Sequence, residues 1–453
     1  MIRLMVARPS RPSQGGLLRP GTIAAAWGIV ALLTLVHILS YVDRMLPLLL
    51  IEKIKHSLEL SDFELGLLMG PAFATSYIIF AIPFGWMVDR WSRMVLLACS
   101  LIFWSAMTAL AGFASGFSLL FVSRLGVGLA EACLSPCALS LIADRVPLNL
   151  RTRAVAIFQT GSTTGAFVAM AGGGTLVAAL EGMPRMELPI VGVREVWQEA
   201  FLISACVGLL PAALLFMSRD RRAQSRREGD HVIAVPASGL KAYLAANLGP
   251  YSCLLVAGIG YTALGNLASW SVAVFSRVWH WDVARAGQVT GTLSLAGALL
   301  GALLAVRISG RRGAKAMPLP FDAIIVGLAL SIFGISGFAQ APGEIAAAIL
   351  YFLGLLGMAC AVTGAMTTLT LTVPRHLRGQ VTAIYFFCVT LVGVAVLQPL
   401  VGAISDRHGL PVAMTGCALA FGVPALMTAI RGRARSHAAI ARQSELEAGA
   451  IAD

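Results

Sequence analysis

The sequence has few charged residues. Asp, Glu, Lys and Arg make up 12% of its 453 residues and 58% are hydrophobic, whereas a soluble domain is typically about 25% charged. This composition excludes an ordinary water-soluble domain and predicts an all-α protein that crosses the bilayer many times. The net charge of +12 could suit a nucleic acid, but its distribution along the chain has another explanation, given below.

The sequence also lacks motifs for metals, nucleotides and covalent chemistry. All eight cysteines fall within apolar runs, which is typical of small buried residues rather than of disulfides. Cys133 and Cys137 share a helix face, but no second ligand pair accompanies them. There is no Walker lysine motif, and no serine has a histidine suited to a membrane protease. We therefore expect no metal, no cofactor and no enzymatic activity.

Twelve apolar runs are long enough to span a bilayer, which takes about 20 helical residues. They are residues 23–50, 62–88, 94–114, 117–143, 153–180, 197–217, 249–276, 283–308, 316–338, 344–372, 379–404 and 410–430. The longest polar interruption separates the sixth run from the seventh. The predicted organisation is a basic N-terminal tail (1–22), a six-helix bundle (23–217), a basic linker (218–248), a second six-helix bundle (249–431) and a C-terminal tail (432–453).

The distribution of Lys and Arg predicts the orientation in the membrane. If the N-terminus is cytoplasmic, 25 of the 34 basic residues fall on the cytoplasmic side, seven fall outside and two lie within the membrane. This bias fits the positive-inside rule and predicts that both termini are cytoplasmic. The excess positive charge is then explained by topology, so we expect a bilayer and no nucleic acid as the partner.

The two halves of the sequence resemble each other. Residues 146–158 and 373–385 share the pattern V-P-x-x-L-R-x-x-x-x-A-I-aromatic at an offset of 227, and Glu131 and Met358 correspond at this offset. Two glycines of the second run likewise match two of the eighth at an offset of 221. Parallel six-helix repeats place a substrate site between the halves, near mid-membrane.

Two charged residues lie inside the first apolar run. A charge near the middle of a membrane helix costs at least about 2.5–3.5 kcal/mol, so Asp43 and Arg44 are expected to face a bundle interior or a water-filled cavity. The alternative is that they anchor the helix at the outer edge of the membrane. Six or seven apolar residues follow before Glu52, which favours the submerged position.

The fourth run adds a second set of buried charges. Arg124 and Glu131 are seven residues apart, almost two helical turns, so they share a face about 10 Å apart. His37 and Arg44 have the same spacing on the first helix. Because these helices run in opposite directions, Arg124 is expected level with Asp43 and Arg44, and Glu131 level with His37. The alternative is a static ion-pair network, but the repeat position of Glu131 is a methionine, so the fold does not require the charge.

A glycine, an acid and two arginines stand between the second and third runs. Gly85, Asp89, Arg90 and Arg93 form the pattern Gly-x-x-x-Asp-Arg-x-x-Arg, through which the chain resembles the major facilitator superfamily of secondary transporters over nearly its whole length. Asp89 can accept hydrogen bonds from Arg145 or from the free amides near residues 378–380, which predicts a clamp on the cytoplasmic side. The alternative is a solvated turn. The second half has a glycine in place of the acid, so any clamp is one-sided.

Tyr41-Val42-Asp43-Arg44, together with Arg124 and Glu131, is similar to the spinster branch of this superfamily, whose members move lysolipids and sphingolipid phosphates. That resemblance implies that Asp43, Arg44, Arg124 and Glu131 carry the function. A related Tyr-x-Asp-Arg occurs in the branch of organic-anion symporters, so helix 1 alone does not decide between them. The second half supplies mostly neutral polar residues, and Tyr261, Asn266 and Trp270 are its candidate substrate contacts. The alternative is helix packing, which is the more common role of such residues.

These features together predict a proton-coupled transporter in a bacterial inner membrane, acting as a monomer on an anionic amphiphile. Arg44 and Arg124 would bind the headgroup, and Asp43 would hold one of them when the site is empty. Glu131 is the expected proton carrier, since burial disfavours its ionised form and Arg124 favours it; Asp43 and His37 are further candidates. The alternatives are a symporter for small organic anions such as sugar acids and, from a different class, a membrane receptor or a lipid-modifying enzyme.

Overall fold

The computed structural model describes residues 20–185, 187–188, 192–218, 243–245, 247–310, 320–374 and 377–452. Most of the predicted N-terminal tail and most of the predicted linker lie outside these ranges. Twelve stretches of the described chain are helices long and apolar enough to cross a membrane, six before residue 218 and six after residue 247. The prediction of an all-α protein with twelve membrane helices is confirmed.

The membrane helices of the first half follow one another with short connections. They are α1 (Pro20–Leu49), α3 (Asp62–Met69) with α4 (Pro71–Arg90), α5 (Arg93–Gly112), α6 (Phe117–Glu131) with α7 (Leu134–Arg145), α8 (Arg151–Phe167) with the π-helical η2 (Val168–Gly172) and α9 (Gly173–Glu181), and α10 (Val196–Met217). Three short elements connect them: α2 (Ile51–Leu58), the 3₁₀ turn η1 (Leu148–Leu150) and an antiparallel pair of strands, β1 (Glu187–Leu188) and β2 (Gly192–Val193).

The second half repeats this arrangement. Its membrane helices are α12 (Leu248–Leu267) with η4 (Ala268–Trp270) and α13 (Ser271–Trp279), α14 (Val283–Ser309), α15 (Pro320–Phe338), α16 (Glu344–Thr372), α17 (Arg378–Thr390) with the π-helical η5 (Leu391–Val396) and α18 (Leu397–His408), and α19 (Leu410–Ala452). The π-helical segments η2 and η5 therefore occur in the fifth and eleventh membrane helices, which are equivalent in the repeat.

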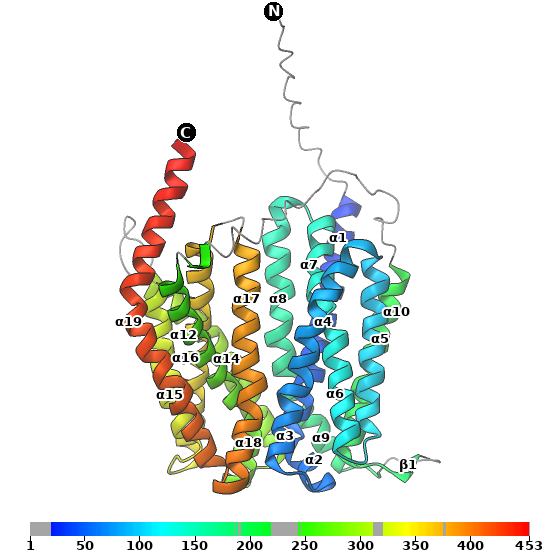
Figure 1. Ribbon diagram of the computed structural model, residues 1–453. Helices are drawn as coiled ribbons and strands as arrows, with labels where there is room; N and C mark the ends of the chain where they lie inside the picture. The colour runs from blue at the N-terminus through cyan, green and yellow to red at the C-terminus, as the bar shows by residue number, and fades with distance from the viewer. Residues whose placement is uncertain are drawn as a thin grey trace, which may run out of the picture.

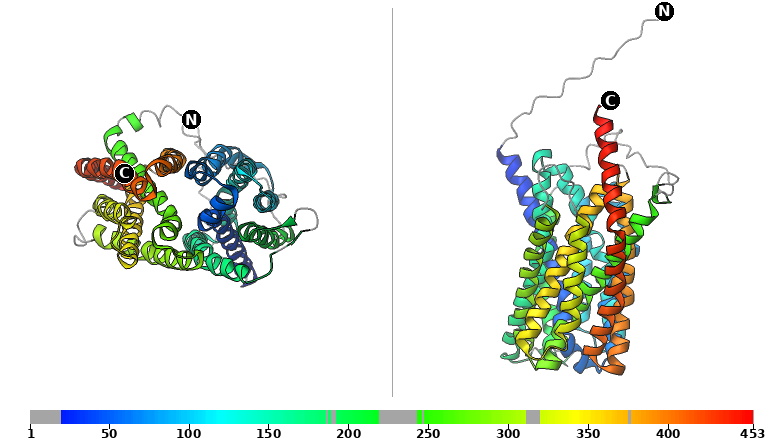
Figure 2. Two further views of the ribbon diagram at one scale, coloured as in Figure 1. Left: turned by 90° about the horizontal axis from the view of Figure 1, so that it is seen from below. Right: turned by 90° about the vertical axis from the view of Figure 1, so that its left-hand side faces the viewer.

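The helices form two groups that lie side by side. Figure 2 (left) shows the blue-to-green helices of the first half on one side and the green-to-red helices of the second half on the other. The start of α1 and the end of α19 lie at the same end of the molecule (Figure 1), here called the terminal end. The other end, where α2 and the strands lie, is called the opposite end.

Local sequence explains where the membrane helices break. Pro71 begins α4 directly after Gly70, because a proline without an N–H is tolerated in the first turn of a helix. Pro136 has no amide to donate to the carbonyl of Ala132, and α6 accordingly ends at Glu131 before α7 begins at Leu134. A capping box formed by Ser61 and Glu64 begins α3, because each side chain bonds to the backbone amide of the other residue.

The two halves pack tightly at the opposite end. A side chain at Gly66 of α3 would collide with the backbone of Gln398 in α18, and one at Gly287 of α14 would collide with the backbone of Met170 in η2. These are two of the glycines that recur at the offset of 221. Glycine is therefore needed at equivalent places in the repeat, because it allows the backbones of the two halves to touch.

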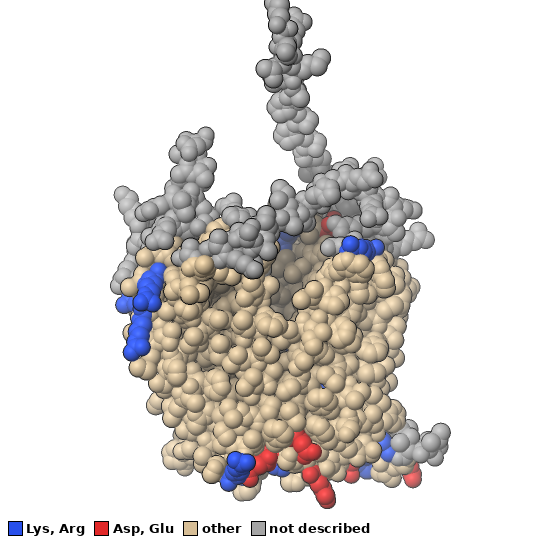
Figure 3. All heavy atoms as spheres, in the orientation of Figure 1, with Lys and Arg blue, Asp and Glu red and all other residues tan. Residues whose placement is uncertain are grey.

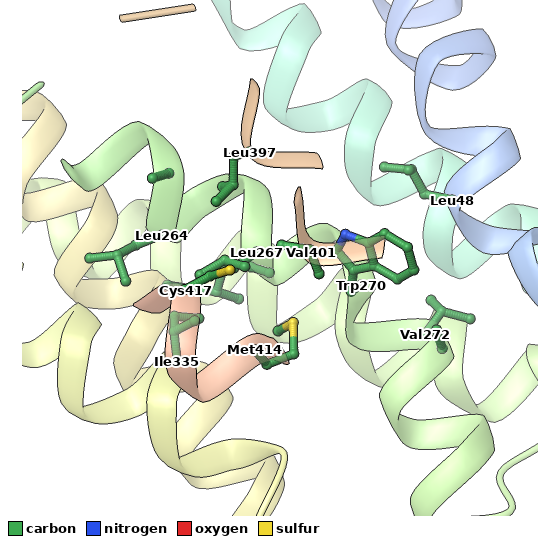
Figure 4. Close-up of a cluster of buried hydrophobic side chains, with 14 of the residues drawn as sticks. Leu48, Leu264, Leu267, Trp270, Val272, Ile335, Leu397, Val401, Met414 and Cys417 are labelled. Atoms are coloured by element: carbon green, nitrogen blue, oxygen red, sulfur yellow. The ribbon is translucent and has the colours of Figure 1, made fainter. Parts of the chain in front are cut away.

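The terminal end is open between the halves, whereas the opposite end is closed. Figure 3 shows a hollow between the halves at the terminal end, a middle zone of this face with almost no charged side chains, and charged side chains of both signs at the opposite end. The largest hydrophobic core joins the two halves near the closed end. Figure 4 shows part of it, where Leu48 of the first half lies near Trp270, Val272 and Val401 of the second.

Candidate functional site

An ion pair between α1 and α6 forms the centre of the candidate site. Glu131 is the last residue of α6, which ends shortly before Pro136, and it is 1% exposed. Its Oε2 accepts hydrogen bonds from Arg44 Nη2 at 2.7 Å and from Ser40 Oγ at 2.8 Å. Its Oε1 is buried and has no hydrogen-bond partner among the described residues. One oxygen of a buried carboxylate thus remains available for a proton or for another donor.

Aromatic rings surround the guanidinium group of Arg44. Its Cζ lies 4.8 Å from the ring centroid of Tyr41, 4.4 Å from that of Phe73 and 5.5 Å from that of Tyr77. Ring faces attract cations, so this cage holds the charged group in place. The side chain is still 26% exposed, which leaves part of it open to a ligand.

The second arginine of the site also lies near the Phe73 ring. Arg124 Cζ is 5.8 Å from the Phe73 centroid, and its Nη1 donates to the backbone carbonyl of Asp43 at 3.2 Å. Gly128 brings α6 close to α4, since a side chain there would collide with the Phe73 carbonyl. Both arginines therefore lie within 6 Å of the same ring, in agreement with the levels predicted for them on the first and fourth membrane helices.

The carboxylate of Asp43 does not pair with either arginine. It is buried, and its Oδ1 accepts from Ser204 Oγ of α10 at 2.5 Å. The expectation that Asp43 holds one arginine in the empty site is wrong in this conformation: Arg44 pairs with Glu131, and Arg124 contacts only the Asp43 backbone. The side chains of Asp43 and Arg44 point in different directions, because adjacent residues on an α-helix are about 100° apart around its axis.

His37 faces α8 and not the ion pair. Its Nδ1 lies 2.9 Å from the carbonyl oxygen of Phe158, which can only accept, so this nitrogen carries the proton. The ring stacks on Phe158 at a centroid distance of 4.4 Å and meets Tyr41 edge-on. Glu131 bonds to Ser40 and Arg44 of the helix that contains His37, and no hydrogen bond or ion pair joins it to His37 in the described chain.

The polar residues predicted to contact substrate from the second half bond to other residues of that half. The hydroxyl groups of Tyr261 and Tyr385 are hydrogen-bonded to each other at 2.9 Å, and Asn266 donates to the carbonyl of Thr262 in its own helix. Trp270 is 0% exposed and donates to Gln398 Oε1 at 2.6 Å. Figure 4 shows Trp270 within the core near the opposite end. Trp270, expected to contact substrate, is a core residue in this conformation.

At the terminal end, the arginines of the Gly-x-x-x-Asp-Arg-x-x-Arg pattern have separate partners. Arg90 lies over the Trp86 ring at 4.1 Å. Arg93 is buried, and its Nη1 donates to Asp144 Oδ2 at 2.6 Å and to Ser140 Oγ at 3.0 Å, so it ties α5 to α7 within the first half. A Cβ at Gly85 would meet no atom within 4 Å.

The predicted clamp involves side chains that are not described. Asp89 belongs to α4, but its side chain lies outside the described part of the structure, as do the side chains of residues 378 and 379. Arg145 ends α7 and is half-buried. The clamp between Asp89 and Arg145 or the start of α17 remains a prediction.

At the opposite end, a charged network joins the halves. Arg277 of α13 donates to both oxygens of Asp62, at 2.7 and 2.8 Å, and to Glu52 Oε1 at 2.9 Å. Asp62 also accepts from Lys55 and Ser405 at 2.5 Å. Arg277 thereby bridges α2 and α3 of the first half to the second half.

A second acid completes this network. Asp406 of α18 accepts from the backbone amides of Asp62 and Phe63 at 2.8 and 3.0 Å, which places a carboxylate at the free N-terminus of α3. The name "opposite-end gate" is used below for Glu52, Lys55, Asp62, Arg277 and Asp406.

Sequence reasoning missed several of these residues. Ser204 gave no signal, because a single serine in a membrane helix is common. The gate residues form no motif in the sequence, and only their partners across the two halves reveal their role. Ser40 is four residues before Arg44 and so shares its face, a spacing that could have identified it.

Comparisons with known proteins agree with this structure. The family described as Major Facilitator Superfamily matches residues 33–396. An MFS-type efflux pump of Mycolicibacterium smegmatis is 30% identical over 289 residues, which is 63% of this chain and 63% of the pump, slightly less than two thirds of its length. Protein spinster homolog 1 of Bos taurus is 28% identical over 88% of this chain and 77% of its own.

A solved structure shares the fold. A bacterial homolog of the human lysosomal transporter Spinster, in an inward-facing and unoccupied conformation, superimposes with a TM-score of 0.73 at 22% identity, covering 92% of this chain and 97% of that one. The resemblance to the spinster branch that was predicted from residues of the first and fourth helices is confirmed.

Proposed function

This chain belongs to the major facilitator superfamily, and we propose that it is a proton-coupled secondary transporter that moves an anionic amphiphile by alternating access. We further propose that it is a monomer in a bacterial inner membrane with its terminal end in the cytoplasm. The structure would then be the inward-open state, since the hollow is at the terminal end (Figure 3) and the opposite-end gate is shut.

The observation that carries the proposal is the Arg44–Glu131 ion pair. Arg44 is partly exposed while Glu131 is fully buried, so an arriving anion reaches the arginine first. An anion that binds Arg44 competes with Glu131 for the same guanidinium group. Glu131 without its partner is a buried charge, which is costly unless the carboxylate takes up a proton. Binding of the anion and uptake of a proton are thereby linked.

The proposed substrate class rests on the difference in charge between the first half, which contributes Arg44 and Arg124, and the second half. Arg44 and Arg124 can bind a phosphate or a carboxylate, because guanidinium groups donate two parallel hydrogen bonds to such oxyanions. The helices α12, α14, α16 and α17 contribute no acidic residue at mid-membrane depth, and several of their hydroxyl groups bond to one another or to backbone. A charged wall facing an apolar one suits an anionic headgroup with a hydrocarbon tail.

Two experiments test the proposal. In proteoliposomes, an imposed pH gradient should drive uptake or release of a labelled lysophospholipid. A binding screen with purified protein should favour anionic lysolipids over sugar acids. Tight binding of sugar acids with no lysolipid binding would identify a small-anion symporter, and binding of either class without flux would favour a receptor.

A further inference from the structure

One aromatic side chain of α4 contacts both arginines of the central site. The ring centroid of Phe73 lies 4.4 Å from Arg44 Cζ and 5.8 Å from Arg124 Cζ. Ring faces attract guanidinium groups within about 6 Å, and the attraction is stronger where water is excluded. Phe73 is half-buried and Arg124 is 4% exposed. The ring is therefore a shared, largely dry partner of two like charges.

Arg124 has few other partners. A guanidinium group has five N–H donors, yet within the described chain Arg124 makes one hydrogen bond, to the backbone carbonyl of Asp43, and no ion pair. Arg44, by contrast, is bound by the carboxylate of Glu131 and by two further rings. The direction of the Arg124 side chain thus depends on the Phe73 ring more than the direction of Arg44 does.

Neighbouring residues fix the position of Phe73. It lies in the first turn of α4, which begins at Pro71. A side chain at Gly128 of α6 would collide with the Phe73 carbonyl, so the two helices are in close contact at this level. One turn further along α4, the Tyr77 ring stacks on Phe73 at a centroid distance of 5.6 Å. Both the backbone and the ring of Phe73 are therefore held in place.

The second half has no ring at this position. Phe73 corresponds to Ser294 at the offset of 221 that relates the second and eighth membrane helices, and Arg124 corresponds to Tyr351 at the offset of 227. The hydroxyl oxygens of Ser294 and Tyr351 lie 3.4 Å apart, so the equivalent positions are again in contact. The fold thus accepts a small polar residue in place of Phe73, and the ring occurs in the half that has the arginines.

We propose that Phe73 is a positioning residue that holds Arg44 and Arg124 together as one oxyanion-binding unit. The inference rests on the proposed function, in which an anion displaces Glu131 from Arg44. The ring takes no part in that exchange, so it keeps the guanidinium group in place while its ionic partner changes. Without the ring, the two arginines would no longer be held at a fixed separation.

Equilibrium binding to the purified full-length chain in lipid nanodiscs tests this role. The probes are dodecyl phosphate, which is anionic, and dodecyl glucoside, which is neutral and has the same chain. Phe73→Leu removes the ring but keeps an apolar side chain. We expect about tenfold weaker binding of dodecyl phosphate and less than about twofold change for dodecyl glucoside. Phe73→Tyr keeps the ring and should restore the affinity for dodecyl phosphate. Wild-type affinity in Phe73→Leu, or equal losses for both probes, would overturn the proposal.

Phe80→Leu is the matched control. Phe80 lies about two turns further along α4, is half-buried and packs against the core of the first half, and no arginine lies over its ring within the described chain. Both probes should bind this variant as they bind the wild type. The same selective loss of dodecyl phosphate binding in Phe80→Leu as in Phe73→Leu would attribute the effect to packing of α4 and would refute the assignment.

A double-mutant cycle tests whether the ring acts through the arginines. Arg124→Lys should weaken dodecyl phosphate binding by a smaller factor in the Phe73→Leu background than in the wild type, because the ring and Arg124 act as one unit. Factors that multiply independently would show that Phe73 does not act through Arg124.

Chemical labelling of arginine gives a readout that needs no ligand. Phenylglyoxal reacts with accessible guanidinium groups, and peptide mass spectrometry measures the extent at each site. In Phe73→Leu we expect several-fold faster labelling of Arg124. Arg93, which is buried and bonded to Asp144, should stay protected and so report an intact fold. Unchanged labelling of Arg124 in a folded Phe73→Leu would overturn the proposal. If dodecyl phosphate does not bind the wild type, the proposed function fails, and labelling still decides the role of Phe73.

Discussion

The two halves of this molecule share one architecture and differ in charge. At the repeat offset of 227, Arg124 corresponds to Tyr351 and Glu131 to Met358. Tyr351 is buried, as Arg124 is, but its hydroxyl accepts a hydrogen bond from Ser271 at 3.2 Å, and it forms no ion pair. The second half therefore builds the same fold with neutral residues. The fold does not need charges at these positions, so those of the first half are best explained by what the protein binds.

The largest expected effect is loss of coupling in Glu131→Gln. Glutamine keeps the size and the hydrogen-bond acceptor but cannot take up a proton. We expect folding to be retained and uptake driven by a pH gradient to fall to the level of empty liposomes, measured as flux in proteoliposomes. Wild-type flux under the same gradient would exclude Glu131 as the proton carrier.

Arg44→Lys and Arg124→Lys should each weaken binding of an anionic amphiphile about tenfold, equivalent to ~1.4 kcal/mol. Lysine keeps the charge but loses the two-pronged donor geometry. A neutral amphiphile with the same chain should be affected much less. Ligand binding and thermal shift should be measured on the same purified variants. Equal losses for charged and neutral ligands, together with lower stability, would make the arginines structural.

Arg277→Gln should open the opposite end. Arg277 holds Asp62 and Glu52 across the two halves, and loss of ~1.4 kcal/mol of differential interaction shifts a two-state equilibrium tenfold. Distances between spin labels on the ends of α2 and α14 should lengthen. Arg285→Gln, which breaks the exposed pair with Glu344, is the matched control and should change little.

The proposed clamp at the terminal end predicts a shift in the other direction, toward the conformation that is open at the terminal end. Asp89→Asn should weaken closure there and shift the population further toward the state seen here. Labels on the terminal ends of α4 and α17 should report longer distances. Identical distributions in wild type and Asp89→Asn would remove the clamp from the account.

The smallest effect is expected in the second half. Tyr351→Phe removes the hydroxyl at the position equivalent to Arg124, and we expect anionic ligand affinity to change less than about twofold. Stability should fall only modestly, because the net contribution of a hydrogen bond is about 1 kcal/mol. A tenfold loss of affinity would mean that the neutral wall also recognises the headgroup.

The sequence was sufficient for the fold and for much of the site. Hydrophobic run length determined the twelve membrane helices, and the spacing of Arg124 and Glu131 placed them on one face. The sequence did not determine in which direction each side chain points. Asp43 and Arg44 are adjacent, yet Asp43 contacts Ser204 and Arg44 contacts Glu131. Whether a polar residue such as Trp270 lines a hollow or fills a core depends on packing between distant helices, which periodicity does not encode.

The central claim is that an anion and Glu131 compete for Arg44. The most direct test measures the affinity of an anionic lysolipid as a function of pH in the wild type and in Glu131→Gln. Protonation of Glu131 releases Arg44, so wild-type affinity should rise as the pH falls, and the variant should bind tightly with little pH dependence. The same pH dependence in both proteins would contradict the account.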